Sequence, residues 1–233
     1  MLKLELKEVV VSVKGGTVVR HADLRVAEGE VLYIIGPNGS GKTSLLRAVL
    51  GYPGYEVVSG RVLFDGEDLT DKPMEYRVKR GLAITHQIPP KISGVKVGDL
   101  LAEILRRRGS TSEFKGITEM LRIEHLLNRD LNRNFSGGEL KRVEIALTMA
   151  QSPKLALIDE PDSGVDVESL RFVARGVKEI LNRSPFKSIV IVTHTGLIAK
   201  YIPPTKVCVM KEGVLKECRL PDFLKRALSE GFG

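Results

Sequence analysis

An eight-residue segment, GPNGSGKT at residues 36–43, contains the residue types needed to bind the phosphates of a nucleotide. It matches the phosphate-loop pattern and lies between an apolar segment and a helical one, as that loop requires. Its glycines allow backbone N–H groups to close around the phosphates, Lys42 reaches the β- and γ-phosphates, and Thr43 offers a hydroxyl to Mg²⁺. The residues expected to bind nucleotide are Gly36, Pro37, Asn38, Gly39, Ser40, Gly41, Lys42, Thr43 and Ser44.

A second apolar segment, KLALIDEPDSG, ends in two adjacent carboxylates, Asp159 and Glu160. The end of a strand beside the phosphate loop would place Asp159 where it can hold Mg²⁺, often through water. Glu160 would then lie one residue nearer the γ-phosphate and could orient or deprotonate the attacking water. A solvated acidic turn is the alternative interpretation, and the presence of the phosphate loop argues against it.

Two more polar residues close apolar strands. Gln87 ends LAITHQ and could bind Mg²⁺ or the attacking water, and His194 ends SIVIVTH and could contact the γ-phosphate. A lone histidine or glutamine at a strand end is more often structural, and we assign that structural role to His86.

The segment NFSGGELKR at residues 134–142 places two adjacent glycines at the start of an amphipathic helix. Ser136 and Glu139 have the spacing of a capping box, so helix capping accounts for both. It does not account for Gly137 and Gly138. Bare N–H groups at a helix start suit an anion. Because the phosphate loop already holds one nucleotide, the second anion site is more useful on the nucleotide of a neighbouring chain.

Alternating strands and helices predict an α/β fold with a mostly parallel sheet covered on both faces. We expect strands at 2–13, 17–26, 31–35, 61–64, 82–87, 155–159 and 188–193, a loop at 51–60, and a hairpin at 206–218. We expect helices at 41–50, 137–151, 166–182 and 197–201, a terminal helix from Asp222, and helical structure from Val97 to Phe135 with breaks near Gly109 and after Leu127.

The composition suits one globular domain of 233 residues, 42% of them hydrophobic. No apolar run approaches the roughly 18 residues of a membrane helix, and the start lacks the apolar core of a signal peptide, so we expect a cytoplasmic protein. The net charge of +7 is scattered. Its one compact cluster, Arg106–Arg108, lies at an expected helix C-terminus. Phosphate-rich ligands or an acidic protein partner are therefore favoured over nucleic acid.

The two cysteines, Cys208 and Cys218, flank the expected hairpin. If Glu212 and Gly213 form its turn, the cysteine side chains point to opposite faces. We therefore expect no disulfide between them, and a metal site would need more ligands.

These motifs, in this order, resemble the ATPase domain of the ABC (ATP-binding cassette) superfamily over nearly the whole chain. GPNGSGKT matches its Walker A motif, Gln87 its Q-loop, and SGGEL its signature. LALIDE matches its Walker B motif with Glu160 as the catalytic glutamate, SGVD (Ser163 to Asp166) its D-loop, and His194 its switch histidine. The resemblance implies an ATPase that uses ATP and Mg²⁺, in which Thr43, Gln87 and Asp159 hold the metal.

The same resemblance implies a single ABC ATPase domain over 1–233. Its phosphate-loop sheet core, parallel or mixed, would carry an N-terminal antiparallel β subdomain and an inserted helical subdomain at about 97–150. Two such domains would meet head to tail, so that Ser136, Gly137, Gly138 and Asp166 of one contact the ATP of the other. Many members stack adenine on an aromatic residue near the position of Val13, which here offers apolar contact alone.

A narrower resemblance is to the SufC-type ATPases of iron–sulfur cluster assembly. It rests on Phe135 and Glu139 of NFSGGELKR, and on DEPDSGVDVESLRFVARGV, RVLFDGEDLT, GLAITHQIP and LSEGFG. It implies SufB/SufD-like scaffold partners and a transient ATP-dependent homodimer, with no membrane and no direct nucleic acid. Ile88 and Ile92 would meet the scaffold, or else belong to an ordinary loop. A transporter ATPase subunit and an ATP-gated clamp on nucleic acid are the alternatives.

Overall fold

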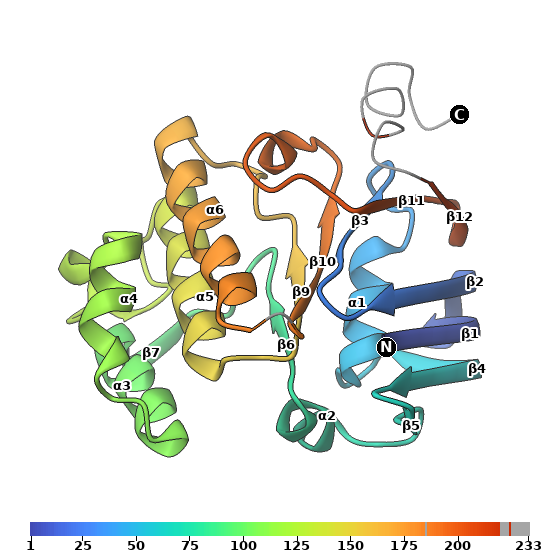
Figure 1. The fold of residues 1–233 in the computed structure, drawn as a ribbon, viewed down its shortest axis with the longest axis horizontal. Helices are drawn as coiled ribbons and strands as arrows, with labels where there is room; N and C mark the ends of the chain where they lie inside the picture. Colours follow the sequence, from blue (N-terminus) through green and yellow to red (C-terminus); the bar gives the residue numbers. More distant parts are fainter. Residues whose placement is uncertain (185, 220–223, 225–233) are drawn as a thin grey trace.

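A ten-stranded mixed sheet organises the chain in the computed structural model, which describes residues 1–184, 186–219 and 224 (Figure 1). In order across the sheet, the strands are β5 (Glu67–Asp68), β4 (Glu56–Phe64), β1 (Leu2–Val13), β2 (Gly16–Ala27), β12 (Val214–Arg219), β11 (Lys206–Lys211), β3 (Val31–Ile35), β10 (Ser188–Thr193), β9 (Leu155–Asp159) and β6 (Leu82–Thr85). The strands from β11 to β6 are parallel, and those from β5 to β2 are antiparallel. The hairpin of β11 and β12 joins the two parts.

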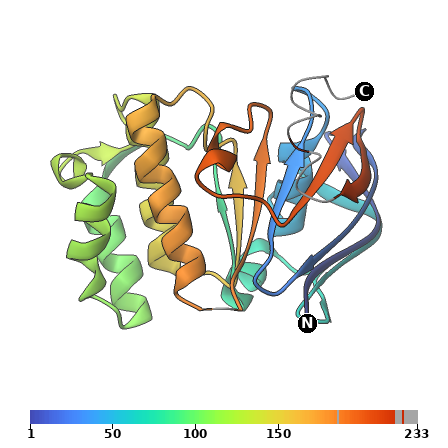
Figure 2. The same ribbon diagram turned by 45° about the horizontal axis from the view of Figure 1, so that its top comes forward.

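Helices cover the parallel strands on both faces, as expected for an α/β fold. They are α1 (Lys42–Leu50), α2 (Met74–Arg80), α3 (Val97–Arg108), α4 (Glu113–Leu121), α5 (Gly137–Gln151), α6 (Val167–Asn182) and the 3-10 turns η1 (Glu124–Leu126) and η2 (Leu197–Lys200). A small sheet of β7 (Ile92–Lys96) and β8 (Asp130–Leu131) lies beside α3. Figure 2 shows α3 and α4 packed outside α5 and α6.

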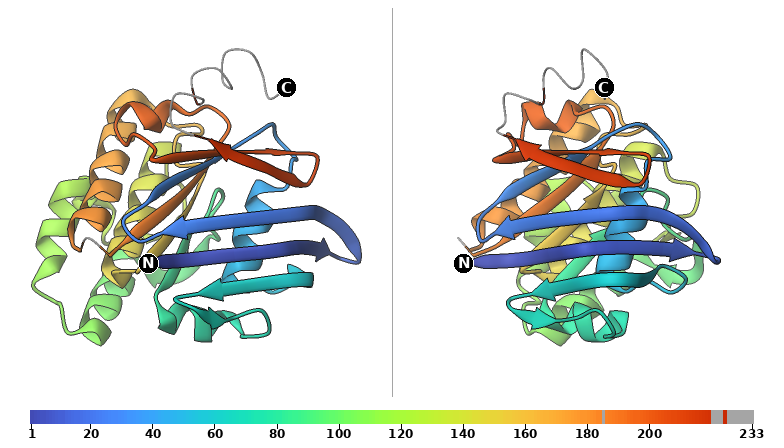
Figure 3. Two further views of the ribbon diagram at one scale, coloured as in Figure 1. Left: turned by 45° about the vertical axis from the view of Figure 1, so that its right-hand side comes forward. Right: turned by 90° about the vertical axis from the view of Figure 1, so that its right-hand side faces the viewer.

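The alternation of side chains along β3 creates two hydrophobic cores. Leu32 and Ile34 pack with α1 and the antiparallel strands, while Tyr33 and Ile35 pack with α5 and α6. The antiparallel strands curl over α1 (Figure 3), so this helix is enclosed between the two parts of the sheet. The predicted architecture of a phosphate-loop core, an antiparallel β portion and inserted helices is confirmed.

Most predicted element boundaries agree with the structure to within one residue, and three differ by more. The predicted loop at 51–60 is a strand from Glu56, because this segment pairs with β1 along the antiparallel edge. The strand predicted at 82–87 ends at Thr85. The helical region ends with the β-strand Asp130–Leu131, which pairs with Ile92 and Lys96. The expected terminal helix from Asp222 lies outside the described residues.

The prediction that the cysteines stay unpaired is wrong, because Cys208 and Cys218 form a disulfide. Near the turn, Lys211 pairs with Val214 and Met210 with Leu215, which is the register that the prediction assumed. A β-bulge then shifts the register by one residue and places Cys218 directly opposite Cys208. The shift turns both side chains to the same face of the hairpin.

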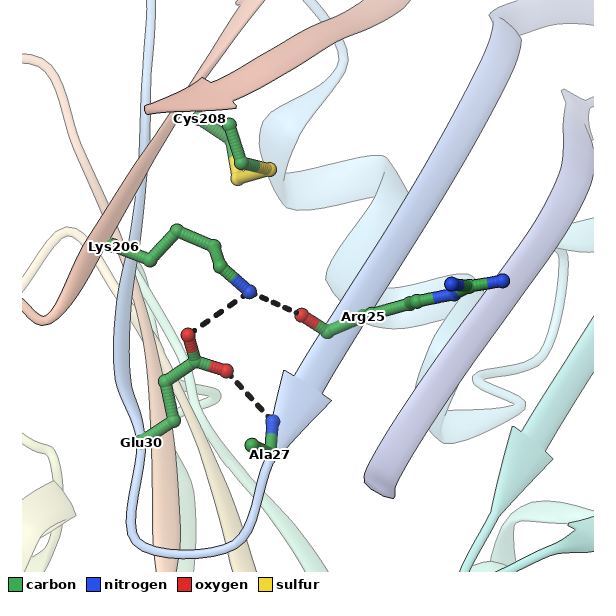
Figure 4. The surroundings of a disulfide bond; sticks show 6 residues. Arg25, Ala27, Glu30, Lys206 and Cys208 are labelled. Atoms are coloured by element: carbon green, nitrogen blue, oxygen red, sulfur yellow. Dashed lines mark hydrogen bonds and ion pairs between the residues drawn. A yellow bond between two sulfur atoms is a disulfide. The ribbon is translucent and has the colours of Figure 1, made fainter. Parts of the chain in front are cut away.

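A group of polar contacts among Lys206, Glu30, Arg25 and Ala27 lies beside this disulfide (Figure 4). Lys206 on β11 pairs with Glu30 at 3.0 Å and donates to the Arg25 carbonyl of β2, also at 3.0 Å. The other Glu30 oxygen accepts a hydrogen bond from the Ala27 N–H at 2.6 Å. The disulfide and these polar contacts together hold the hairpin where the two parts of the sheet join and where Val214 and Leu215 of β12 pair with β2.

Replacing Cys218 with Ser should lower the free energy of unfolding by about 2–3 kcal/mol without reductant, as expected for a short closed loop. Cys218 is the suitable position because it is partly exposed, whereas a serine at the fully buried Cys208 would bury an extra hydroxyl. Denaturant unfolding with and without dithiothreitol measures the effect. In reductant the two proteins should agree, and a difference that persists there would show that the disulfide is not its source.

Candidate functional site

The phosphate loop joins the buried strand β3 to α1 and passes close to the C-terminal hairpin. A Cβ atom on Gly36 would lie 2.0 Å from the Met210 carbonyl oxygen, so only glycine fits there. Gly41 caps α1 with φ 103°, in the region that favours glycine. The Gly213 N–H of the hairpin turn donates to the Ser40 carbonyl at 3.0 Å. The loop conformation is therefore supported by residues far along the chain.

The Lys42 amine lies inside this loop and donates to the carbonyls of Gly36 and Pro37, both at 2.8 Å. Burial lowers its pKa, and the nearby carboxylates of Glu160 and Asp159 oppose that shift. The buried Ser40 hydroxyl has no hydrogen-bond partner among the described residues. An amine and a free hydroxyl in one loop provide polar groups for a phosphate oxygen.

Asp159, the first carboxylate of the acidic pair, ends strand β9 and contacts the phosphate loop. The Thr43 hydroxyl donates to Asp159 at 3.0 Å, and this aspartate is 1% exposed. Burial raises the pKa of Asp159, while the bond from Thr43 acts to lower it. Mg²⁺ prefers oxygen ligands and takes few of them from protein. One hydroxyl and one carboxylate in contact at the phosphate loop fit that ion.

The second carboxylate, Glu160, is 3% exposed and has φ 49°, in the sparsely populated left-handed region. Its backbone N–H donates to the Val192 carbonyl of β10 at 2.9 Å. Its side chain lies 2.5 Å from Nδ1 of His194, which follows β10. Two predicted catalytic side chains from neighbouring parallel strands therefore meet at the same end of the sheet.

A surface cleft runs beside these groups and contains most of the predicted nucleotide residues. It is lined by Val18, Asn38, Gly39, Gly41, Lys42, Thr43, Ser44, Gln87 and Glu160. Val13 is not among its lining residues, whereas Val18 of β2 is. The sequence pattern offered no signal for Val18, because contacts between distant segments place it there. Its carbonyl oxygen lies against Gly41 of the phosphate loop and against Gly213 of the C-terminal hairpin.

The signature segment begins α5 with the predicted capping box. The Ser136 hydroxyl accepts from the Glu139 N–H, and the Glu139 carboxylate accepts from the Ser136 N–H. A Cβ on Gly137 would lie 2.3 Å from the Gly164 carbonyl oxygen, and one on Gly138 would lie 2.2 Å from the Ser169 hydroxyl. Both glycines thus allow α5 to approach residues 164–169 of the same chain, a reason that the sequence did not reveal.

Two charged residues of α5 hold the segment that carries Gln87. The buried Glu144 accepts from the backbone N–H of His86 and lies 3.2 Å from its ring Nδ1. Lys141 donates to the carbonyls of Gln87 and Asp159 at 3.1 and 3.3 Å. Burial lowers the pKa of Lys141. Lys141 and Glu144 were not expected at the site, because charged residues in a helix usually face solvent.

Residues 19–163, more than half of the chain, match the model of a protein family described as ABC transporter. The chain belongs to the ABC transporter family. It is 35% identical to the "Probable ATP-dependent transporter ycf16" of Cyanophora paradoxa, covering 98% of this chain and 93% of that protein. It is 32% identical to "Vegetative protein 296" of Bacillus subtilis, with 98% and 91% covered.

The fold of this ABC protein also matches a solved structure described as a nucleotide-free ATP-binding cassette from an ABC transporter. The TM-score is 0.80 with 26% identity, and the match covers 98% of this chain and 96% of the other. The chain is therefore an ABC ATPase, which binds ATP and hydrolyses it to ADP and phosphate. In the part of this ABC ATPase that the structure describes, no helix is long and apolar enough to cross a membrane.

Proposed function

We propose that the cleft binds Mg-ATP and that Glu160 positions the water that attacks the γ-phosphate. Lys42 would bind the β- and γ-phosphates, and Thr43, Asp159 and Gln87 would hold Mg²⁺. The ion would neutralise charge on the transferring phosphoryl group. The observation that carries this assignment is that Glu160 lines the cleft and also contacts His194.

In this mechanism most of the catalysis comes from positioning, because the phosphoryl transition state needs little covalent help. Glu160 orients the water or accepts its proton. The contact between Glu160 and Nδ1 of His194 leaves Nε2 as the ring nitrogen for a phosphoryl oxygen. Burial of Glu160 keeps its carboxylate away from bulk water, which strengthens its interactions within the site.

We also propose that two copies close head to tail, with the signature of each on the nucleotide of the other. Ser136 and Asp166 line one surface cleft, so a phosphate presented by a second copy would meet both residues together. Gly137 and Gly138 bring this helix start against the loop at 164–166, which makes the signature and the D-loop one continuous surface. The homodimer would form on ATP and separate after hydrolysis.

The partner we propose is a soluble scaffold of the SufB/SufD type, which the closing of two copies would reshape. Support comes from the SufC-like segments of the sequence and from the segment that follows Gln87. There Ile88 is 81% exposed and Ile92 40% exposed. The side-chain amide of Asn132 donates to the Pro90 carbonyl at 3.0 Å and so fixes this segment against β8. An exposed apolar pair on a fixed segment suits protein docking.

Replacing both Ile88 and Ile92 with alanine should weaken scaffold binding at least about tenfold, since two exposed isoleucines would lose their apolar contact. ATP binding should be unchanged, because neither residue lines the cleft. Pull-down with purified SufB/SufD-like proteins and titration with ATP measure the two effects. Val58→Ala on β4 is the matched control, because that side chain is 55% exposed on a distant strand. Equal capture of scaffold by the parent, the double variant and Val58→Ala would show that Ile88 and Ile92 do not form the docking surface.

A transporter ATPase subunit is the second candidate, and the name of the Cyanophora relative, an ATP-dependent transporter, favours it. Purification from the native cell separates the candidates, since the co-purifying partner would be a soluble scaffold, a membrane permease or nucleic acid. The cluster Arg106–Arg108 gives little support to a nucleic-acid clamp. Arg106 and Arg107 both pair with Glu103, and Arg108 pairs with Glu113, so two carboxylates already offset part of the positive charge of this cluster.

A further inference from the structure

Asp162 is a buried carboxylate that the proposed mechanism does not use. It lies two residues after Glu160, in the turn between β9 and α6, and is 3% exposed. A buried carboxylate is costly unless hydrogen bonds satisfy it. The partners of Asp162 therefore indicate what it stabilises.

All three hydrogen bonds that the structure gives the Asp162 side chain come from the end of β10 and the segment that follows it. Oδ1 accepts from the Thr193 hydroxyl at 2.8 Å, and Oδ2 accepts from the Thr195 hydroxyl at 2.7 Å. Oδ2 also accepts from the Ile198 N–H at 3.1 Å, at the start of the η2 turn. Both carboxylate oxygens are thus used to hold one loop.

The residues bound by Asp162 flank His194 on both sides. The Thr193 hydroxyl that donates to Asp162 also accepts from the N–H groups of Thr195 and Gly196, at 3.1 and 3.0 Å. The backbone on either side of His194 is therefore fixed by one network that begins at Asp162. The same turn carries Glu160, so the two partners of the 2.5 Å contact are held relative to each other.

We propose that Asp162 is a positioning residue that holds His194 against Glu160 for ATP hydrolysis. It acts through Thr193 and Thr195 and does not touch the nucleotide. The inference rests on the proposed roles of Glu160 and His194. It adds that the rate depends on a carboxylate outside the cleft, because small displacements of reacting groups lower rates strongly.

The first test is Asp162→Asn, which keeps the size of the side chain but leaves one acceptor oxygen where there were two. In either orientation of the amide, part of the network is lost. We expect kcat to fall about 10- to 100-fold while ATP affinity stays within about twofold. Steady-state phosphate release measures kcat, and calorimetric titration measures ATP affinity. A kcat within about twofold of the parent would overturn the proposal.

A double-mutant cycle with His194→Ala separates positioning from general destabilisation. If Asp162 acts through His194, Asp162→Asn should change kcat little once His194 is absent. An equal further fall in that background would overturn the proposal, because Asp162 would then act elsewhere. If His194→Ala alone left hydrolysis unaltered, the proposed role of His194 would fail instead, so the two failures can be told apart.

Thr195 provides a second test that leaves the buried carboxylate in place. Thr195→Val removes the hydroxyl at nearly constant shape, whereas Thr195→Ser keeps it. We expect the valine variant to lower kcat about 3- to 10-fold, because it loses the bond to Asp162 and the one that the hydroxyl accepts from the Leu197 N–H at 3.3 Å. The serine variant should stay near the parent. Equal rates in the two variants would overturn the proposal, even if Asp162→Asn failed to fold.

Discussion

Glu160→Gln is expected to lower ATP hydrolysis about 100-fold or more, the range for removal of a general base. Glutamine has the shape of glutamate and can still hydrogen-bond to His194, so the buried site should stay intact. What it lacks is the negative charge that orients or deprotonates water. ATP binding should persist, because Lys42 and the phosphate loop are unchanged.

The same variant should accumulate as an ATP-bound dimer, since closure without hydrolysis leaves two copies together. Light scattering in ATP and in ADP would show the dimer in ATP alone. Glu75→Gln on α2 is the matched control, because it makes the same chemical change on an exposed residue that does not line the cleft. Hydrolysis by Glu160→Gln at the parent rate would show that Glu160 is not the base.

Gly138→Ala is expected to lower both the stability and the rate of ATP hydrolysis. This substitution tests why the signature contains glycines. The added Cβ would lie 2.2 Å from the Ser169 hydroxyl oxygen and 2.6 Å from its Cβ. Overpacking of this kind destabilises a protein by about 1–3 kcal/mol. It would also push the start of α6 away from α5, and we expect ATP hydrolysis to fall at least about tenfold, since the signature and the D-loop would separate.

Adding Ser169→Gly to Gly138→Ala should recover most of the stability and of the activity, because it removes both atoms that clash. Thermal unfolding and ATPase rates of the single and double variants measure this recovery, and Ser169→Gly alone is the control. If stability returned while hydrolysis stayed low, a bare helix start would be needed for the phosphate of the partner copy. The packing explanation of Gly138 would then be insufficient.

The parts of the fold that sequence predicted well are those fixed by local chemistry. Ser136 and Glu139 set the start of α5, and the predicted helix at 137–151 agrees with the structure to the residue. The apolar run at 31–35 and the glycine loop behind it specified the strand, the phosphate loop and most of α1. Asp159 and Glu160 ended a buried strand, and parallel pairing then brought them beside Lys42 and His194.

The features that sequence did not predict depend on contacts between distant segments. The bulge in the hairpin changed the residue that lies opposite Cys208, and no residue near the turn indicates that shift in register. Val18 lines the nucleotide cleft because β2 packs against Gly41 and the distant Gly213. The two signature glycines looked like a phosphate site because their nearest neighbours, Gly164 and Ser169, are far ahead in the chain.

The position of β3 has a consequence for the order in which the protein becomes functional during synthesis. Both neighbours of β3 in the sheet, β10 and β11, come from the last quarter of the sequence. The carbonyl that packs on Gly36 belongs to Met210, and the N–H that holds Ser40 belongs to Gly213. Long-range pairings of this kind form late. A nascent chain whose phosphate loop has already left the ribosome should therefore not bind ATP. Binding should begin once the hairpin of β11 and β12 has also emerged.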